Sequence, residues 1–165
     1  MNATKSPYLA NDWRLADVVA ALQLLSSYKW ASRRVEDWAE TLGKPLSGKS
    51  WEEIFTNHPE FFRLNDKGWA SLRWRHAYDR NYHVERGVEL TPDELSEMSE
   101  GEKDEALSRK ALSADQTEAL IKTAIDLHSR AVATQQEARW WIPVAAIGAS
   151  FVGGVVGAIL GAVLR

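Results

Sequence analysis

Apolar side chains recur every three or four residues in three segments of the first third of the chain. Over 14–28 they follow the i, i+3, i+4, i+7 spacing of an amphipathic helix. A second helical pattern spans 32–42, and a third begins at Ser50, where Glu53 completes an N-terminal capping box. The pattern therefore predicts three helices, with a very short strand at 29–31 between the first two.

In the stretches EFFRLND and WASLRWR, which meet at a DKG turn, apolar side chains recur at every second residue instead. Alternating apolar and polar side chains predict a β-hairpin with one buried face, and we expect Trp74 on that face. The outward face and the turn carry the candidate contacts for nucleic acid or a protein partner. These residues are Arg63, Lys67, Trp69, Arg73 and Arg75.

Three helices followed by a short hairpin, over about 12–78, resemble the winged helix-turn-helix domain. The resemblance implies a mainly α fold with a small β-hairpin; another small α+β domain with the same elements is the alternative. The stretches ADVVAALQ, NHPEFFRL and ASLRWR also resemble a group of small bacterial proteins that end in an apolar segment, a resemblance that brings no known activity. Six of the eight tryptophans lie in the first half, where we expect a compact aromatic core.

Charge divides the rest of the chain. Residues 1–90 hold 13 Lys or Arg against 12 Asp or Glu, whereas 91–139 hold 6 against 11. Helix starts are predicted at Thr91 and, through a capping box with Gln116, at Ser113. The predicted organisation is a winged-helix-like domain over 1–88, an acidic linker or short helix over 89–112, an amphipathic, weakly heptad helix over 113–139 and a transmembrane helix over 140–164. The heptad helix pairs with copies of itself or lies on the N-terminal domain.

Residues 140–164 hold no ionisable side chain, and a bilayer core needs about 20 apolar residues as a helix. We therefore expect a single-span, tail-anchored protein of the bacterial inner membrane, in contact with membrane lipid. The N-terminal domain is expected in the cytoplasm, because the first residues lack the apolar stretch of a signal peptide. The predicted membrane-interface residues are Arg139, Trp140, Trp141 and Arg165.

Small residues spaced by four form two rows in this apolar segment, a pattern that lets membrane helices pack closely. The predicted packing residues are Ala149, Gly153, Gly157 and Gly161 in one row and Ser150, Gly154 and Ala158 in the other. They favour a homo-oligomer, which by analogy with two-part membrane effectors of anti-phage defence would disrupt the membrane. The alternatives are a membrane-tethered DNA-binding regulator and a non-toxic membrane adaptor.

No catalytic constellation is found in the sequence. The chain has no cysteine, its four histidines form no metal-binding pair, and no phosphate-binding loop or nucleophile elbow is present. His58, at the end of the third helix, is interpreted as a capping or surface residue. We therefore expect no enzymatic activity, no catalytic residue, no cofactor and no metal.

The predicted third helix weighs against DNA binding. Its sequence, SWEEIFTNH, has two glutamates and neither Lys nor Arg, although a winged helix usually reads DNA with this helix. A cytoplasmic protein partner is therefore the favoured prediction, with nucleic acid as the alternative.

Overall fold

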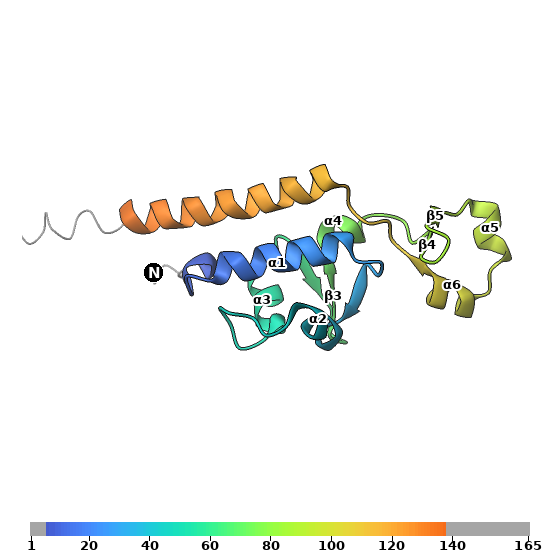
Figure 1. Ribbon diagram of the computed structural model, residues 1–165, viewed down its shortest axis with the longest axis horizontal. Helices are drawn as coiled ribbons and strands as arrows, with labels where there is room; N and C mark the ends of the chain where they lie inside the picture. The colour runs from blue at the N-terminus through green and yellow to red at the C-terminus, as the bar shows by residue number, and fades with distance from the viewer. Residues whose placement is uncertain (1–5, 138–165) are drawn as a thin grey trace, which may run out of the picture. The chain divides into compact units, whose positions relative to one another are not determined.

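The computed structural model describes residues 6–137 (Figure 1). The chain divides into two compact units, Met1–His128 and Ser129–Arg165. The described residues are mainly helical and contain two small antiparallel sheets, which confirms the coarse prediction of a mainly α fold.

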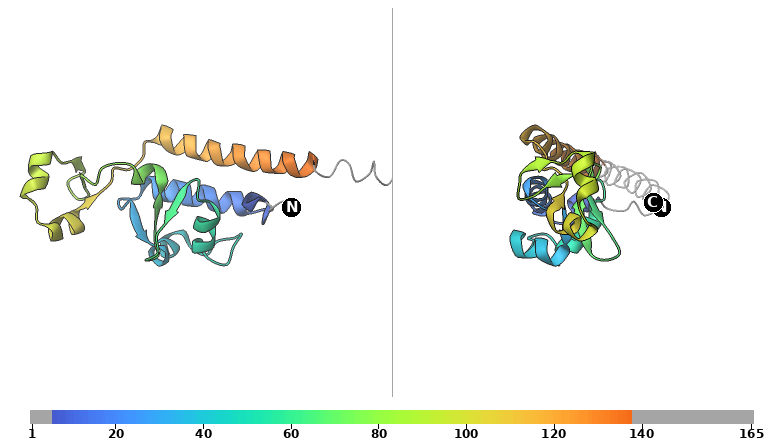
Figure 2. Two further views of the ribbon diagram at one scale, coloured as in Figure 1. Left: turned by 180° about the vertical axis from the view of Figure 1, so that it is seen from behind. Right: turned by 90° about the vertical axis from the view of Figure 1, so that its right-hand side faces the viewer.

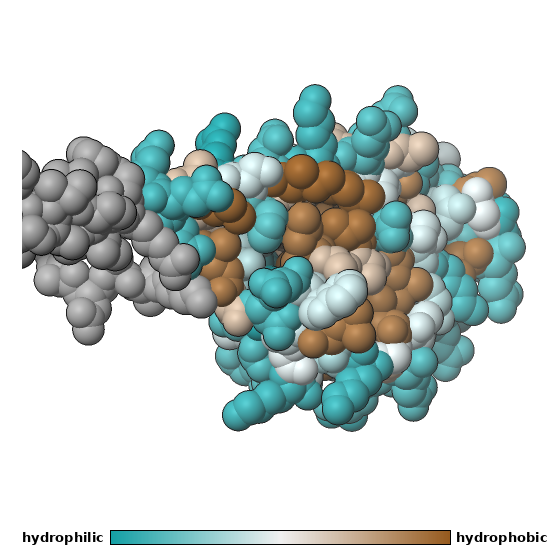
Figure 3. All heavy atoms as spheres, turned by 60° about the vertical axis from the view of Figure 1, so that its left-hand side comes forward, coloured by the Kyte–Doolittle hydropathy of each residue, from teal (hydrophilic) through white to brown (hydrophobic). Residues whose placement is uncertain are grey.

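The core is built on α1 (Arg14–Ser27), which follows the short 3₁₀ helix η1 (Pro7–Leu9). Val18, Leu22 and Leu25 of α1 are completely buried, as the helical spacing over 14–28 predicted. The exposed positions of α1 are uncharged as well: Ala16, Ala20, Gln23 and Ser27. Figure 3 shows a broad apolar area on one face of the molecule.

Two further helices follow α1 and close the core. They are α2 (Val35–Leu42) and α3 (Trp51–Asn57), whose start is capped by the Ser50 side chain as predicted. The short strand predicted at 29–31 is instead β1 (Ser32–Arg34), which takes up residues assigned by the sequence to the second helix. The chain stays extended here because β1 pairs with the later strand β3.

The first sheet has the strand order β1-β3-β2, with β2 (Phe62–Leu64) and β3 (Trp69–Leu72) forming the predicted hairpin. Phe62, Ala70 and Leu72 are buried against the helices. The turn contains Gly68 at φ 76°, in the left-handed region that glycine adopts without strain.

The second strand of the hairpin ends at Leu72, earlier than the alternation in the sequence predicted. A helical turn, α4 (Arg73–His76), begins directly after β3 and changes the period from two to that of a helix. Arg75 is therefore fully buried, although it was predicted to face outward, and Trp74, predicted to be buried, is 39% exposed.

A second sheet lies in the segment that the sequence assigned largely to an acidic linker. It has the order β5-β4-β6 and consists of β4 (Tyr82–His83), β5 (Val88–Glu89) and β6 (Leu107–Ser108). Between β5 and β6 lie α5 (Pro92–Glu97), which begins at Thr91 as predicted, and α6 (Glu100–Ala106). Both helices begin with complete capping boxes.

A long helix spans 114–137 and begins at the predicted Ser113–Gln116 capping box. Its residues 114–128 lie beside α1: Ala124 is completely buried, and the Leu112 N–H just before the helix donates to the Ser26 carbonyl at 3.0 Å. Figures 1 and 2 show this part of the helix alongside α1. Of the two predicted positions, this part of the helix thus takes the one on the N-terminal domain.

The expected aromatic core is smaller than predicted. Only Trp38 and Trp51 are buried among the tryptophans of the first half. Trp13, Trp69 and Trp74 are 59%, 42% and 39% exposed. Large aromatic surface is therefore available on the outside of the domain.

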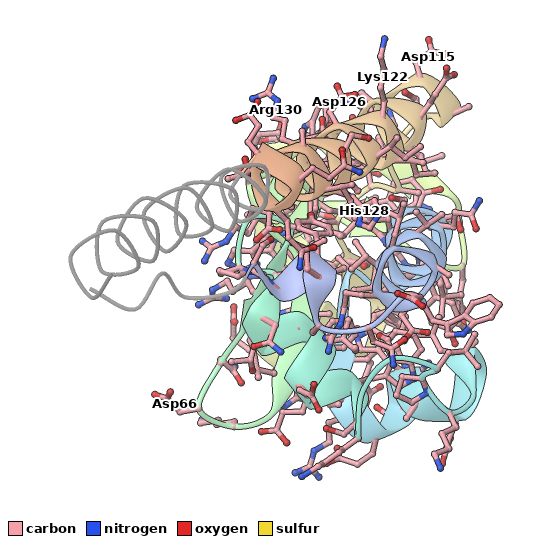
Figure 4. The ribbon with its side chains drawn as sticks, turned by 90° about the vertical axis from the view of Figure 1, so that its left-hand side faces the viewer. Asp66, Asp115, Lys122, Asp126, His128 and Arg130 are labelled. Atoms are coloured by element: carbon pink, nitrogen blue, oxygen red, sulfur yellow. The ribbon has the colours of Figure 1, made fainter. Side chains whose placement is uncertain are left out.

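The membrane prediction is corrected. Among residues 6–137, no helix combines the length and hydrophobicity needed to cross a bilayer; helix 114–137 carries charged side chains such as Asp115, Lys122 and Asp126 on its outer side (Figure 4). This finding overturns the expectation of a tail-anchored inner-membrane protein, and with it the membrane effector, tethered regulator and membrane adaptor. The segment 140–164 and the predicted interface residues Arg139 and Arg165, on which that expectation depended, lie outside the described residues, as do the predicted glycine rows.

Candidate functional site

A groove of about 800 Å³ runs along β1, between the first sheet and the segment that carries β6. Six of its lining residues matter for its chemistry: Trp30, Ser32, Trp69, Arg80, Leu107 and Arg109. They come from β1, β3, β6 and the residues flanking β1 and β6, except for Arg80, which lies two residues before β4. The groove therefore joins parts of the chain that are far apart in the sequence.

The edge of β1 that faces away from β3 is unpaired in the described sheet, because the strand order is β1-β3-β2. The Val35 N–H donates to the Gly68 carbonyl at 2.9 Å, which fixes which backbone groups point toward β3. By antiparallel alternation, Arg33 also points its backbone groups toward β3, while both backbone groups of Ser32 and the N–H of Arg34 point away. Arg34 is the N-cap residue of α2, so its carbonyl accepts the first hydrogen bond of that helix. Two backbone donors and one acceptor thus lie along the free edge.

Side chains on the two faces of β1 have different surroundings. Arg33 lies on the inner face, with its guanidinium 4.9 Å from the Tyr28 ring centroid and 5.3 Å from that of Trp38. Ser32 and Arg34 share the outer face with Trp69, which is directly opposite Arg34 in the register. The outer face next to the free edge is therefore aromatic and cationic.

Arginines hold the opposite wall of the groove in place through backbone carbonyls. Arg109 Nε donates to the carbonyls of His76 and Tyr78 at 3.1 and 2.9 Å. Arg80 Nε donates to the Leu107 carbonyl at 3.1 Å. At one end of the groove, the Ala31 N–H donates to Ser108 Oγ at 2.9 Å and ties the two walls together.

Most lining carboxylates are committed to arginines. Asp37 lies 3.8 Å from Arg33 and Asp104 lies 2.8 Å from Arg80. Arg109 has no carboxylate within ion-pair distance in the described part of the chain. Burial, and then the nearby charges of Arg80 and Arg63, hold the pKa of Arg109 below its ordinary value, although Asp79 acts in the opposite direction.

The candidate contacts predicted from the sequence come together only in part. Trp69 lines the groove, and Arg63, opposite Ser71 in the register, lies on the same outer face of the sheet without lining the groove. Lys67 is exposed in the turn and Arg73 is exposed just after β3. Arg63 Nη1 lies 3.0 Å from His76 Nε2, and Arg73 donates to the Pro59 carbonyl. Of the predicted set, only Trp69 therefore lines the groove.

The prediction for Arg75 is wrong, because its side chain is enclosed. It donates to the backbone carbonyls of Leu25, Tyr28, Lys29, Arg109 and Lys110. Burial lowers the pKa of Arg75 to about 10, and the neighbouring Arg109 acts in the same direction. Arg75 is thus a structural residue that joins the end of α1 to the wall of the groove.

The histidines take different positions. His58, interpreted as a capping or surface residue, ends α3 but is completely buried, with Nδ1 3.0 Å from Glu60 Oε1. Burial, Arg109 and Arg63 together lower the pKa of His76. Within residues 6–137, no group of three or more potential ligand side chains could hold a metal ion.

A second, more open groove of about 1240 Å³ lies beside β5. Its lining residues Glu89 and Lys110 pair with each other at 3.1 Å, and none of its described lining residues is a tryptophan. The edge at β5 is two residues long. The groove along β1 is therefore the stronger candidate for a binding site.

No protein-family model, no curated protein and no solved structure matches the chain. The resemblances drawn from the sequence consequently stay predictions. The groove along β1 and its side chains are the observations from which a function can be inferred.

Proposed function

We propose that residues 14–72 form a winged-helix-like domain that binds a protein partner, and that an extended segment of this partner adds as a strand to β1. The proposed role is binding rather than catalysis. The observation that carries the proposal is the free edge of β1, which opens into a groove with Trp30 and Trp69.

The element order supports a winged-helix-like domain. It runs α1, β1, α2, α3, β2, β3, and the sheet has the order β1-β3-β2. A hairpin after three helices is the arrangement on which the resemblance rests, and the structure adds the strand β1 between the first two helices. The turn between β2 and β3 projects from the domain in the manner of a wing, with Asp66 at its tip (Figure 4).

An exposed strand edge alone would be weak support, because proteins often protect short edges with charged side chains, as Arg33 and Arg34 would do here. The surroundings of β1 supply the stronger argument. Trp69 is 42% exposed beside the edge, and half-exposed aromatic side chains are frequent anchors of protein interfaces. The groove is concave and walled by β6, so it fits a single extended chain better than the flat edge of a second copy.

Protein is favoured over nucleic acid because of α3. Trp51, Ile54 and Phe55 face the core, and the exposed side of this short helix presents Glu52. A carboxylate near a phosphate backbone is repelled, and affinity for nucleic acid depends on neutralising phosphates. The helix that would enter a DNA groove therefore lacks the charge it would need.

The test begins with a display library of random peptides of about ten residues, enough to cross the groove at roughly 3.3 Å per residue in a strand. Selected peptides are then measured against two variants of the full chain. Arg34→Pro removes an N–H of the free edge, and Arg34 already has φ −63°, which proline adopts. Arg34→Ala removes the same side chain but keeps the N–H.

We expect Arg34→Pro to bind about tenfold more weakly than Arg34→Ala, because one backbone hydrogen bond is lost and the proline ring blocks the approaching strand. Equal affinity of the two variants, with unchanged circular dichroism, would contradict strand addition. Failure to select any peptide would contradict peptide binding itself.

A further inference from the structure

We infer that the partner segment carries an aspartate or glutamate that binds Arg109 on the outer face of the sheet, next to the side chain that packs on Trp69. The inference rests on the proposed strand addition and names the chemistry of the partner. The inference predicts that the partner segment is acidic rather than basic or purely apolar.

The geometry of a strand supplies the first step. A segment added to β1 would place alternate side chains on the outer face and on the inner face of the sheet. Side chains on the outer face would lie beside Trp69 and Arg34, which are opposite each other in the register. Partner residues two positions apart would therefore meet the same aromatic and cationic surface.

Arg109 is held in place at this surface before any ligand binds. Its Nε is bonded to the carbonyls of His76 and Tyr78, while no bond of its terminal Nη atoms is found among the described residues. A guanidinium fixed in this way can bind a carboxylate, by donating hydrogen bonds to it, with little loss of side-chain entropy. Its half-buried position also strengthens the attraction relative to an exposed arginine.

The charges around Arg109 favour an anion. Arg80 and Arg63 act on it electrostatically more strongly than Asp79 does in the opposite direction, and the Arg80 partner Asp104 is already in an ion pair. Glu105 is the remaining lining carboxylate without an arginine partner in the described part of the chain, and it is exposed, where water screens its charge. An acidic side chain from the partner would supply the counter-charge that Arg109 lacks.

The inference is tested on the same selected peptides. Each peptide is compared with its isosteric amide, Asp replaced by Asn or Glu by Gln, in binding to the full chain by fluorescence anisotropy. We expect acidic residues to be enriched in the selection, and the amide peptides to bind about tenfold more weakly. Arg109→Gln should remove most of this difference, whereas Arg86→Gln, a cation paired with Glu94 outside the groove, should leave it intact.

The outcomes separate this inference from the proposed function. Peptides that bind Arg34→Pro weakly but tolerate the amide change would overturn the role of Arg109 and leave strand addition in place. Acidic peptides that bind Arg34→Pro and Arg34→Ala equally would overturn both. The comparison of acid and amide peptides on the unmodified chain remains decisive even if Arg109→Gln does not fold.

Discussion

Arg75 and Arg109 donate hydrogen bonds to the backbone of each other's segment. Arg75 Nη2 donates to the Arg109 carbonyl at 2.8 Å, and Arg109 Nε donates to the carbonyl of His76, the residue after Arg75, at 3.1 Å. This reciprocal pair joins the chain where it leaves the first sheet to the chain where it returns from β6. The wall of the groove is therefore fixed to the domain that carries β1.

Replacing Arg75 by methionine should strongly destabilise the fold. Five backbone carbonyls would lose their donor, and removing one member of a buried charged network typically costs about 3–5 kcal/mol. Urea unfolding followed by tryptophan fluorescence measures the loss. Arg86→Met, at an exposed arginine, should stay within about 0.5 kcal/mol of the parent; similar values for the two variants would contradict the structural role of Arg75.

Asp17→Asn should destabilise the loop before α3. Asp17 is buried, and its carboxylate accepts from the N–H groups of Leu46 and Ser47 at 3.0 and 2.7 Å and from Ser47 Oγ at 2.5 Å. An amide offers one acceptor oxygen in place of two, so we expect a loss of about 1–3 kcal/mol. Asp66→Asn, in the exposed turn between β2 and β3, is the matched control and should have no measurable effect in the same unfolding experiment.

Two glycines should respond to alanine in opposite directions. Gly68 has φ 76° in the hairpin turn, where a β-carbon is strained, so Gly68→Ala should cost about 1–2 kcal/mol. Gly101 lies in α6 with open space around it and without positive φ, so Gly101→Ala should stabilise by about 0.5–1 kcal/mol. Thermal unfolding distinguishes the two; a stabilising Gly68→Ala would contradict the turn.

The loss of folding stability at acidic pH should depend on Glu60. Its Oε1 accepts from the Tyr8 hydroxyl at 2.9 Å and lies 3.0 Å from His58 Nδ1. Burial raises the pKa of Glu60, but hydrogen bonds from His58, from its backbone N–H and from Tyr8 outweigh burial, so the pKa lies below the ordinary 4.5. A depressed carboxyl pKa gives stability that is complete above the unfolded pKa and is lost as the pH falls through the folded pKa.

The free energy of unfolding should therefore decline below the ordinary pKa of 4.5, and Glu60→Gln should make this decline shallower. Urea titrations at a series of pH values provide the measurement. Glu36→Gln, at an exposed carboxylate, serves as the control. A decline in Glu60→Gln as steep as in the parent would exclude Glu60 as its source.

Local patterns predicted local structure well. The three N-terminal helices, the caps of α3, α5 and helix 114–137 at Ser50, Thr91 and Ser113, and the hairpin turn follow from residues within a few positions of one another. Strands β4, β5 and β6 escaped prediction, and β1 was expected three residues too early, because each strand is two or three residues long and exists through pairing with distant residues. Too few positions alternate in such strands to reveal a period of two.

The candidate site was predictable only in part. Trp69 was identified from the hairpin alternation, but that alternation failed one residue after β3, where α4 begins at Arg73. Arg75 is buried because backbone carbonyls 34 to 50 residues away converge on it, which no local pattern records. Arg109 lies in the segment 89–112 that was interpreted as an acidic linker, and Arg80 near the end of the predicted domain 1–88, so no local pattern placed either residue opposite Trp69.

Amide hydrogen exchange at β1 tests the central proposal most directly. NMR of the full chain, with and without a saturating selected peptide, reports the Ser32, Arg33 and Arg34 amides separately. Strand addition predicts that exchange at Ser32 or Arg34 slows by about tenfold or more, while Arg33, already directed toward β3, changes little. Bound peptide with unchanged exchange at both Ser32 and Arg34 would contradict it.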